Sequence, residues 1–284
     1  MKKNISISTG GYNNLTGFNA IKFLKKNKIT SIELSGGKYS KNQIKNILSL
    51  KKKLTLRVHN YFPPQKIPFV INLASDNKKI LNRSIAHIKK SIRLVKKLGS
   101  GTYSFHAGFR LDPSVKSLGK KFEKTRMISK QKAFRNFVRE TLKISKYAKK
   151  NKVNIMIENN VLTKKNLKRF RSNPFLLTNY SDVKNFFRRM PKNVKLLIDV
   201  AHLKVSAKTE KNNLIKSLKI MNKYVGGYHF SDNNGYVDSN KSFKKNAWFL
   251  PYIRKNLDYY SIEVYRQTPN KLKNQINILK KKLS

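Results

Sequence analysis

The chain has 284 residues, with 64 Lys and Arg against 13 Asp and Glu, which gives a formal net charge of +51. That length can bury a proper core, and a hydrophobic content of 39% is too high for a disordered basic tail. The lack of Cys excludes disulfides, thiolate zinc sites and cysteine nucleophiles. Because we find neither a long apolar run nor a secretory signal, we expect a cytoplasmic protein without a membrane span.

Short apolar runs bounded by turn residues predict eight strands. In chain order they are Ile5–Ser8, Ser31–Leu34, Leu54–His59, Thr102–His106, Asn154–Glu158, Lys195–Asp199, Gly227–Ser231 and Tyr259–Val264. Segments with helical spacing alternate with these strands, at Phe18–Lys26, Lys41–Leu50, Ile80–Leu98, Gln131–Lys150, Ser181–Arg189, Leu214–Tyr224, Phe243–Asn256 and Pro269–Leu283. Eight strand–helix units of about 35 residues are typical of a (β/α)8 barrel, so we predict an α/β protein with a single TIM-barrel domain over residues 1–284.

The basic charge favours anionic partners without identifying them. Lysine pairs recur in segments with helical spacing instead of gathering in one cluster. We interpret them mainly as solvated helix faces, so nucleic-acid binding is an alternative that the charge permits but does not favour. A positive field would also concentrate phosphorylated or carboxylated small molecules near the protein.

The scarce acids and histidines gather at the C-terminal ends of the predicted strands or directly after them. They are Glu33, His59, His106, Glu158, Asp199, His202, His229, Asp232 and Glu263. A buried carboxylate without a partner is costly, whereas carboxylate and imidazole groups that converge from several strands form a mixed oxygen and nitrogen site. We therefore predict that the barrel binds a divalent metal ion (Mn, Co, Zn or Mg) at this end. The longest irregular connections, 61–76, 109–127 and 159–177, follow strands and are expected on the same face.

Six short motifs resemble, in order, those of the xylose-isomerase-like TIM-barrel superfamily, which includes sugar and sugar-phosphate isomerases and epimerases and the endonuclease IV abasic-site nucleases. They are HNYFPPQKIPFVINLAS (59–75), FHAG (105–108), IENN (157–160), DVAH (199–202), HFSDNNG (229–235) and IEV (262–264). The resemblance implies that a central metal ion is held by Glu158, Asp199, His229 and Glu263. It also implies that Glu158 and Glu263 exchange a proton with the substrate carbon next to a carbonyl.

The expected substrate contacts come partly from the resemblance. It implies that His202 contacts a substrate oxygen and that Glu33 lies in the pocket. We further expect contacts from Asp232 and from Asn160, for which a supporting role beside Glu158 stays open.

The endonuclease IV branch provides a second interpretation. His59 and His106 resemble the first two ligands of a second metal ion in that branch, with Glu158 as the bridge, and they are alternatively substrate contacts. After the seventh strand, however, the nuclease pattern Asp-x-His is replaced by residues 238–240, which read Asp-Ser-Asn. Asn is a poor substitute for an imidazole ligand, so this departure argues against a third metal ion.

The sequence thus predicts a metal-dependent isomerase or epimerase that acts on a sugar or sugar phosphate. Two alternatives remain, namely an endonuclease IV-like abasic-site phosphodiesterase and a barrel that binds a sugar or polyanion without catalysis. The identity of the sugar, of the metal ion and of any homo-oligomer stays open.

Overall fold

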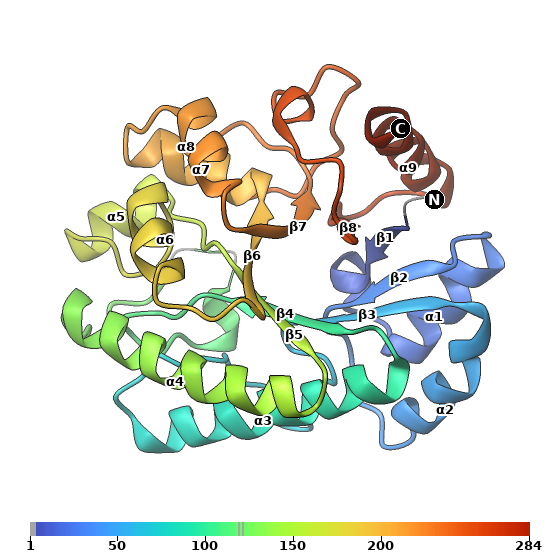
Figure 1. Cartoon of the computed structure of the whole chain (residues 1–284), viewed down its shortest axis with the longest axis horizontal. Helices are drawn as coiled ribbons and strands as arrows, with labels where there is room; N and C mark the ends of the chain where they lie inside the picture. Colours follow the sequence, from blue (N-terminus) through green and yellow to red (C-terminus); the bar gives the residue numbers. More distant parts are fainter. Residues whose placement is uncertain (1–3, 119, 121) are drawn as a thin grey trace.

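The computed structural model describes residues 4–118, 120 and 122–284 and contains a closed barrel of parallel strands surrounded by helices (Figure 1). Each strand pairs with the next in chain order, and β8 closes the barrel by pairing with β1. The strands are β1 (Ile5–Ser8), β2 (Ser31–Leu34), β3 (Thr55–His59), β4 (Thr102–His106), β5 (Asn154–Glu158), β6 (Val194–Asp199), β7 (Val225–Phe230) and β8 (Tyr259–Ile262). The predicted (β/α)8 barrel is confirmed, and every predicted strand is present with its ends moved by at most two residues.

The helices follow the strands around the outside of the barrel (Figure 1). They are α1 (Gly17–Lys26), α2 (Gln43–Leu50), α3 (Lys78–Leu98), α4 (Lys130–Lys150), α5 (Lys164–Phe170), α6 (Tyr180–Phe187), α7 (Val200–Thr209), α8 (Leu214–Met221) and α9 (Pro269–Leu283). Short 3-10 turns lie at Thr9–Tyr12, Lys51–Lys53, Val115–Ser117 and Leu250–Tyr252. Within the described ranges, no helix is both long and apolar enough to cross a membrane.

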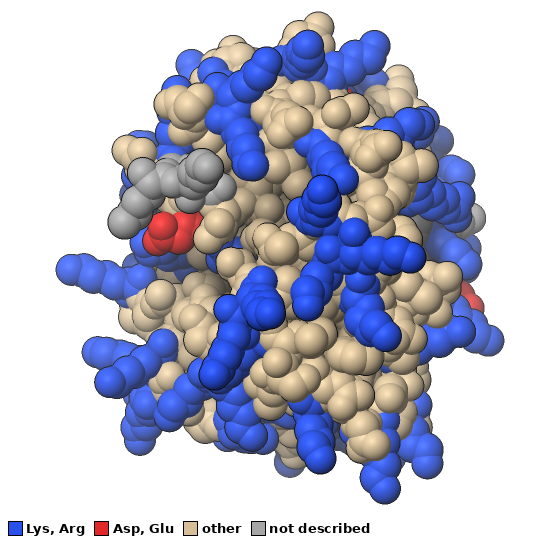
Figure 2. Space-filling model, turned by 90° about the vertical axis from the view of Figure 1, so that its right-hand side faces the viewer, with Lys and Arg blue, Asp and Glu red and all other residues tan. Residues whose placement is uncertain are grey.

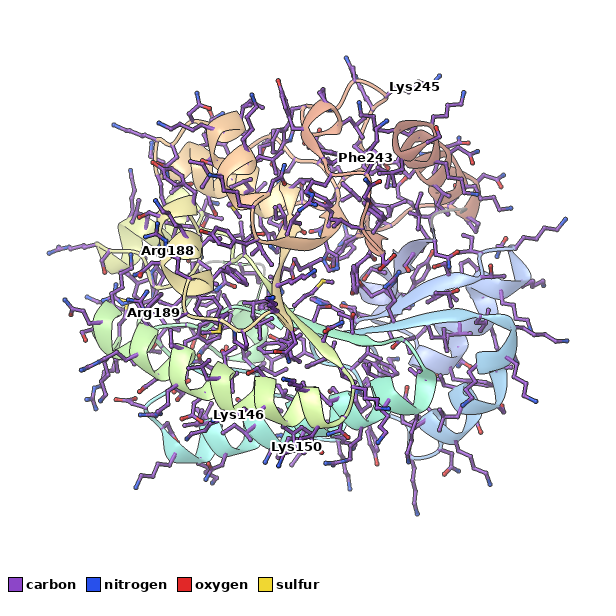
Figure 3. All side chains as sticks on the ribbon, in the orientation of Figure 1. Lys146, Lys150, Arg188, Arg189, Phe243 and Lys245 are labelled. Atoms are coloured by element: carbon purple, nitrogen blue, oxygen red, sulfur yellow. The ribbon has the colours of Figure 1, made fainter. Side chains whose placement is uncertain are left out.

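One predicted helix, Phe243–Asn256, is wrong. This segment is a loop between β7 and β8 with a single 3-10 turn (Figure 3, where Phe243 and Lys245 are labelled). Pro251 lies in that turn, and proline cannot donate the backbone hydrogen bond that a longer helix needs. Phe243 and Phe249 are nevertheless buried against Phe230 of β7, so the apolar spacing reflects packing of a loop and not of a helix.

Local sequence explains where the long helices begin and end. In α3 the side chain of Asn77 accepts hydrogen bonds from the backbone N–H groups of Lys79 and Ile80, which satisfies donors that have no partner inside the helix. The helix ends at Gly99, whose φ of +72° is readily adopted only by glycine. Between these ends, an apolar stripe that includes Ile88 and Ile92 is fully buried beneath the helix.

Successive side chains of each strand point alternately outward, toward the helices, and inward, toward the barrel axis. Outward-facing residues such as Ile32, Phe105 and Ile198 join the main hydrophobic core between strands and helices. A small separate cluster of Met156, Leu197 and Tyr259 comes from the other face of the strands. This apolar layer lies inside the barrel, and the polar residues at the C-terminal strand ends lie above it.

Candidate functional site

The barrel brings the carboxyl ends of its strands together, because all the strands run in the same direction. The register places His106 of β4 beside Glu158 of β5, and Asp199 of β6 beside His229 of β7. His202 lies in the first turn of α7, where its backbone N–H donates to Asp199 Oδ1 at 2.7 Å. That bond caps α7, a helix that was not predicted because it follows β6 without any loop.

Four histidines surround Glu158, which is fully buried. Its Oε2 atom lies 3.2 Å from His59 Nε2 and 3.4 Å from His106 Nδ1. Its Oε1 atom lies 3.2 Å from His229 Nδ1 and 3.5 Å from His202 Nδ1. Glu158 is therefore the central group of the site.

The four residues predicted to bind the central metal ion are close together. One potential ligand atom from each of Glu158, Asp199, His229 and Glu263 lies within 4.8 Å of the others. The distance from His229 Nδ1 to Glu263 Oε2 is 3.1 Å. Two further groups that could hold an ion share Glu158, one with His59 and His229 and the other with His106 and His202.

Several of these atoms have no hydrogen-bond partner although they are buried. Among the described residues, this holds for both carboxylate oxygens of Glu158, for Asp199 Oδ2 and for His229 Nδ1. Buried polar atoms without a well-formed hydrogen bond are rare in folded proteins, and here the Glu158 oxygens have only imidazole nitrogens at 3.2–3.5 Å as described neighbours at ion-pair distance. These oxygen and nitrogen atoms converge on one small region and form the mixed donor set that a divalent cation prefers, so the residues present fit a metal ion.

The electrostatics of the protein without an ion reflect this crowding. Burial by itself would raise the pKa of Glu158, but the surrounding histidines outweigh burial and hold it well below its usual range. Burial raises the pKa of Asp199 to about 7, although His202 opposes the shift. The pKa of His229 is well above its usual range because nearby carboxylates outweigh the effect of burial. Protonated imidazoles thus balance the carboxylates where a divalent cation would otherwise do so.

A chain of buried hydrogen bonds lies beneath the site. His229 Nε2 is 3.0 Å from Glu33 Oε2, and the same oxygen accepts a hydrogen bond from the Tyr259 hydroxyl. Tyr259 also bonds Ser104 Oγ at 2.9 Å, and Ser104 Oγ lies 3.0 Å from His59 Nδ1. By holding one nitrogen of each imidazole, this chain turns His229 Nδ1 and His59 Nε2 toward Glu158.

Glu33, which was expected in the pocket, has no exposed surface and lies against His229. Neither of these two residues is among those that line the cavity. Burial tends to raise the pKa of Glu33, but the charge of His229 and the hydrogen bonds lower it to about 2, so Glu33 is an anion that orients His229.

A cavity of about 1660 Å³ opens above the site on the C-terminal face. His59, His106, His202, Asp238 and Glu263 contribute to its lining. Parts of the three long connections that follow β3, β4 and β5 also line it, as the sequence predicted.

Two other residues were expected to contact substrate. Asp232 forms an ion pair with Lys204 at 2.6 Å and is not among the residues that line the cavity. Asn160 lines the cavity, but its amide nitrogen donates to the carbonyl oxygens of Ala107, Gly108 and Leu176 at 3.0–3.1 Å. Asn160 therefore holds the loops after β4 and β5 in place.

Sequence reasoning missed three residues at the site. Asp238 Oδ2 lies 3.2 Å from His202 Nε2, and the Tyr265 hydroxyl donates to Glu263 Oε1 at 3.0 Å. Tyr259 is the third. Its position could have been found, because residues 259, 261 and 263 alternate onto the same face of the last strand. Asp238 also had a signal, because it stands at the Asp of the nuclease pattern Asp-x-His that residues 238–240 match in part.

Asn240, which replaces the expected histidine of the nuclease pattern, does not contribute a ligand atom. Its side-chain amide donates to the backbone carbonyl of Glu263 at 3.2 Å. His202 and Asp238 thus form a pair without the third side chain of that pattern.

The basic residues cover the surface broadly. Lys and Arg are spread over the whole face shown in Figure 2, where few acids are visible. Lys146 and Lys150 lie on α4, and Arg188 and Arg189 directly follow α6, on the outside of the barrel (Figure 3). Much of the charge is thus remote from the strand ends, and it provides a general positive field instead of one binding patch.

Comparisons with known proteins agree with this architecture. Among solved structures, the chain is similar to a D-tagatose 3-epimerase-like protein, with 16% identity and a TM-score of 0.73 over 99% of this chain and 97% of that one. It is also similar to 3-keto-D-glucoside 4-epimerase from E. coli (13% identity, TM-score 0.67, 97% of this chain and 100% of that one). A third similar structure is D-psicose 3-epimerase from Clostridium cellulolyticum (15% identity, TM-score 0.60, 100% and 96%).

At these identities the structural likeness establishes the fold alone. No curated protein matches the sequence significantly. A family model described as a xylose isomerase-like TIM barrel matches residues 15–263, which is most of the chain. The protein therefore belongs to the xylose isomerase-like TIM barrel family.

Proposed function

We propose that the protein is a metal-dependent isomerase or epimerase that acts on a sugar or sugar phosphate in the cytoplasm. The observation that carries the proposal is the convergence of buried ligand atoms of Glu158, Asp199 and His229 with Glu263, which lines a large cavity. The similar solved structures named above are epimerases of sugars, which supports the same reaction class.

The chemistry needs a weakly acidic C–H bond and carboxylates that can hold its proton. A divalent ion bound by Glu158, Asp199, His229 and Glu263 would polarise a sugar carbonyl and acidify the neighbouring C–H bond. Glu263 faces the cavity, and Tyr265 fixes its Oε1 atom, so this carboxylate is placed to take a proton from the substrate carbon. Glu158 is the second carboxylate. Its low pKa keeps it ionised but makes it a weak base, so we expect it to return a proton to the substrate carbon more readily than to remove one.

The path of the proton determines the product. If the proton returns to the same carbon from the opposite face, the sugar is epimerised. If it returns to the former carbonyl carbon, the carbonyl group moves along the chain. In both cases the substrate neither gains nor loses atoms overall, so no further co-reactant is needed. The positive field around the barrel would favour a phosphorylated sugar over a neutral one.

Exchange of substrate hydrogen with solvent deuterium tests this proposal. The manganese-loaded protein is incubated in D₂O with a panel of ketohexoses, ketopentoses and their phosphates, and deuterium incorporation is measured by NMR. We expect incorporation by the unmodified protein and its loss in Glu158→Gln and Glu263→Gln. Glu140→Gln is a matched control, because Glu140 lies on α4 and pairs with Arg139 and Lys143. Incorporation that persists in both site variants would refute the assigned roles, and no incorporation with any sugar would favour a non-catalytic barrel.

A second candidate function is cleavage of phosphodiesters at abasic sites in DNA. It is favoured by the position of His59 and His106, which both approach Glu158 Oε2 as ligands of a second ion would. The Asn240 amide, which is bound to a backbone carbonyl, argues against it. Nicking of abasic-site duplex DNA by metal-loaded protein, absent in a chelated control and in His59→Ala, would support this function over isomerisation.

A further inference from the structure

The cavity above the candidate metal centre is larger than a single sugar needs. Its volume is about 1660 Å³, whereas pockets for ligands of drug size usually measure about 300–1,000 Å³. A monosaccharide held at the strand ends would fill only the floor. The remaining space extends outward between the loops that follow the strands, so a second part of the substrate can lie there.

The outer wall of this cavity is unusually apolar for such a basic protein. Tyr39, Val115 and Val237 line it and are 48%, 43% and 42% exposed. Ile67 and Tyr236, which are 70% and 57% exposed, are direct chain neighbours of lining residues. Together these five residues form what we call the apolar rim. Large apolar side chains that gather around an opening mark a binding surface more often than they occur by chance.

Few other large apolar side chains of this protein are exposed to solvent in the ranges that the structure describes. Across the described residues, six large hydrophobic side chains are classed as exposed, and the sixth is Phe23 on α1. Phe23 does not line the cavity and packs on Tyr12 at a ring distance of 5.5 Å. Of these six residues, three line the cavity and two adjoin lining residues in the chain.

Charged groups divide the cavity into an inner and an outer part. The acids that line it, Asp238 and Glu263, both belong to the candidate site at the floor. The lining cations are Lys38, Lys66, Lys120, Lys165, Lys241 and Arg266. In the part of the chain that the structure describes, none of these six side chains forms an ion pair. The walls thus offer unpaired positive charge, which suits phosphate groups.

We propose that the substrate is a nucleoside diphosphate sugar whose sugar ring carries a keto group, which supplies the carbonyl that the proposed proton transfer needs. The sugar lies on the floor at the candidate metal centre, the diphosphate meets the lining lysines, and the base packs against the apolar rim. Tyr39 lines the cavity and presents an aromatic ring on which a nucleobase can stack. The ring of Tyr236 is covered by Lys208, whose Nζ atom lies 3.6 Å from the ring centroid. A sugar phosphate alone would leave the rim uncovered. The proposal rests on the proposed function, since it names the substrate class of the same site.

Binding to the protein without its metal tests this proposal independently of catalysis. The full chain is stripped of metal by EDTA and dialysed, so that binding does not arise from chelation. Isothermal titration then compares UDP, GDP and dTDP with inorganic pyrophosphate, which carries the diphosphate charge without a base, and with fructose 6-phosphate. We expect at least one nucleoside diphosphate to bind about ten-fold more tightly than pyrophosphate, in line with one stacked base.

Two variants test the position of the base. Tyr39→Ala should remove most of the ten-fold preference, whereas Phe23→Ala, which changes an exposed aromatic residue away from the cavity, should leave it unchanged. Equal binding of nucleoside diphosphates and pyrophosphate would overturn the proposal, because the charge alone would then explain it. Equal effects of the two variants would also overturn it, as would a shift in sedimentation of Tyr39→Ala, which would identify the rim as an interface between copies of the chain.

The experiments distinguish failure of the proposed isomerase activity from failure of the proposed nucleotide-linked substrate. Loss of deuterium exchange with every sugar would refute the isomerase activity and leave nucleotide binding measurable. Absence of nucleotide binding in a protein that exchanges deuterium into ketohexose phosphates would refute only the larger substrate.

Discussion

Tyr259→Phe removes one hydroxyl group from the buried chain beneath the candidate metal centre. That hydroxyl donates to Glu33 Oε2 and bonds Ser104 Oγ, so it connects the supports of His229 and His59. The substitution leaves the ring and the packing inside the barrel unchanged. It therefore tests whether the chain orients the two imidazoles or only fills space.

The expected effects follow from the bonds that are lost. A hydrogen bond to a charged group contributes about 1.5–3 kcal/mol and a neutral one about 1 kcal/mol, so loss of both should lower the free energy of unfolding by roughly 2–4 kcal/mol. For a chain of this size that corresponds to a fall in Tm of roughly 4–16 °C. Loss of a group that supports metal-binding histidines typically weakens metal affinity by about 10–100-fold, and we expect a change in that range for Mn²⁺ or Co²⁺.

Tyr260→Phe is the matched control, since it makes the same change one residue later. The Tyr260 hydroxyl donates to the Arg254 carbonyl and accepts from the Leu257 N–H on the outside of the barrel. Metal affinity is measured by titration calorimetry and stability by thermal unfolding of the metal-free proteins. We expect both variants to lose stability and only Tyr259→Phe to lose affinity. Equal metal affinities in the two variants would refute the positioning role of the buried chain.

Three further predictions concern stability. Burial lowers the pKa of His87 to about 4 against about 6.5 in the unfolded chain. Below pH 6.5 the unfolded chain therefore binds a proton that the folded protein does not, and the free energy of unfolding falls by roughly 3 kcal/mol as the pH drops toward 4. Urea unfolding between pH 4 and 8 should show this slope reduced in His87→Gln, and an unchanged slope would contradict it. Asn160→Ala removes three hydrogen bonds to carbonyls and should lower the unfolding free energy by roughly 2–3 kcal/mol, whereas a loss near zero would mean that the loops after β4 and β5 are held otherwise. In Gly227→Ala the new Cβ would lie 2.7 Å from Tyr259 Cβ, so overpacking should cost about 1–3 kcal/mol in thermal unfolding, and a wild-type Tm would show that the ring can move.

The strands could be predicted from sequence because each is a short apolar run bounded by turn residues, and all except β1 have an acid or histidine near the C-terminal end. In a parallel barrel those ends meet by necessity, so the convergence of Glu158, Asp199 and Glu263 followed from the order of the elements. The same logic placed His59 and His106 correctly beside Glu158.

Other features depended on contacts between distant segments. Glu33 occupies a strand end like the other acids, but only the three-dimensional packing shows that it is fully buried against His229 and Tyr259. The distance between Asp238 and His202 depends on the path of the loop after β7, although the partial Asp-x-His pattern pointed to Asp238. Apolar spacing in 243–256 resembled a helix because Phe243 and Phe249 pack on the barrel from a loop.

The most direct test of the central claim is the amount of metal bound per chain. Elemental analysis of protein purified without chelator should find close to one divalent ion, lost in Glu263→Ala and kept in His59→Ala. That result would place the ion at the group formed by Glu158, Asp199, His229 and Glu263. A protein that binds no ion even after reconstitution with manganese, cobalt or zinc would contradict the account, as would an ion that Glu263→Ala does not affect.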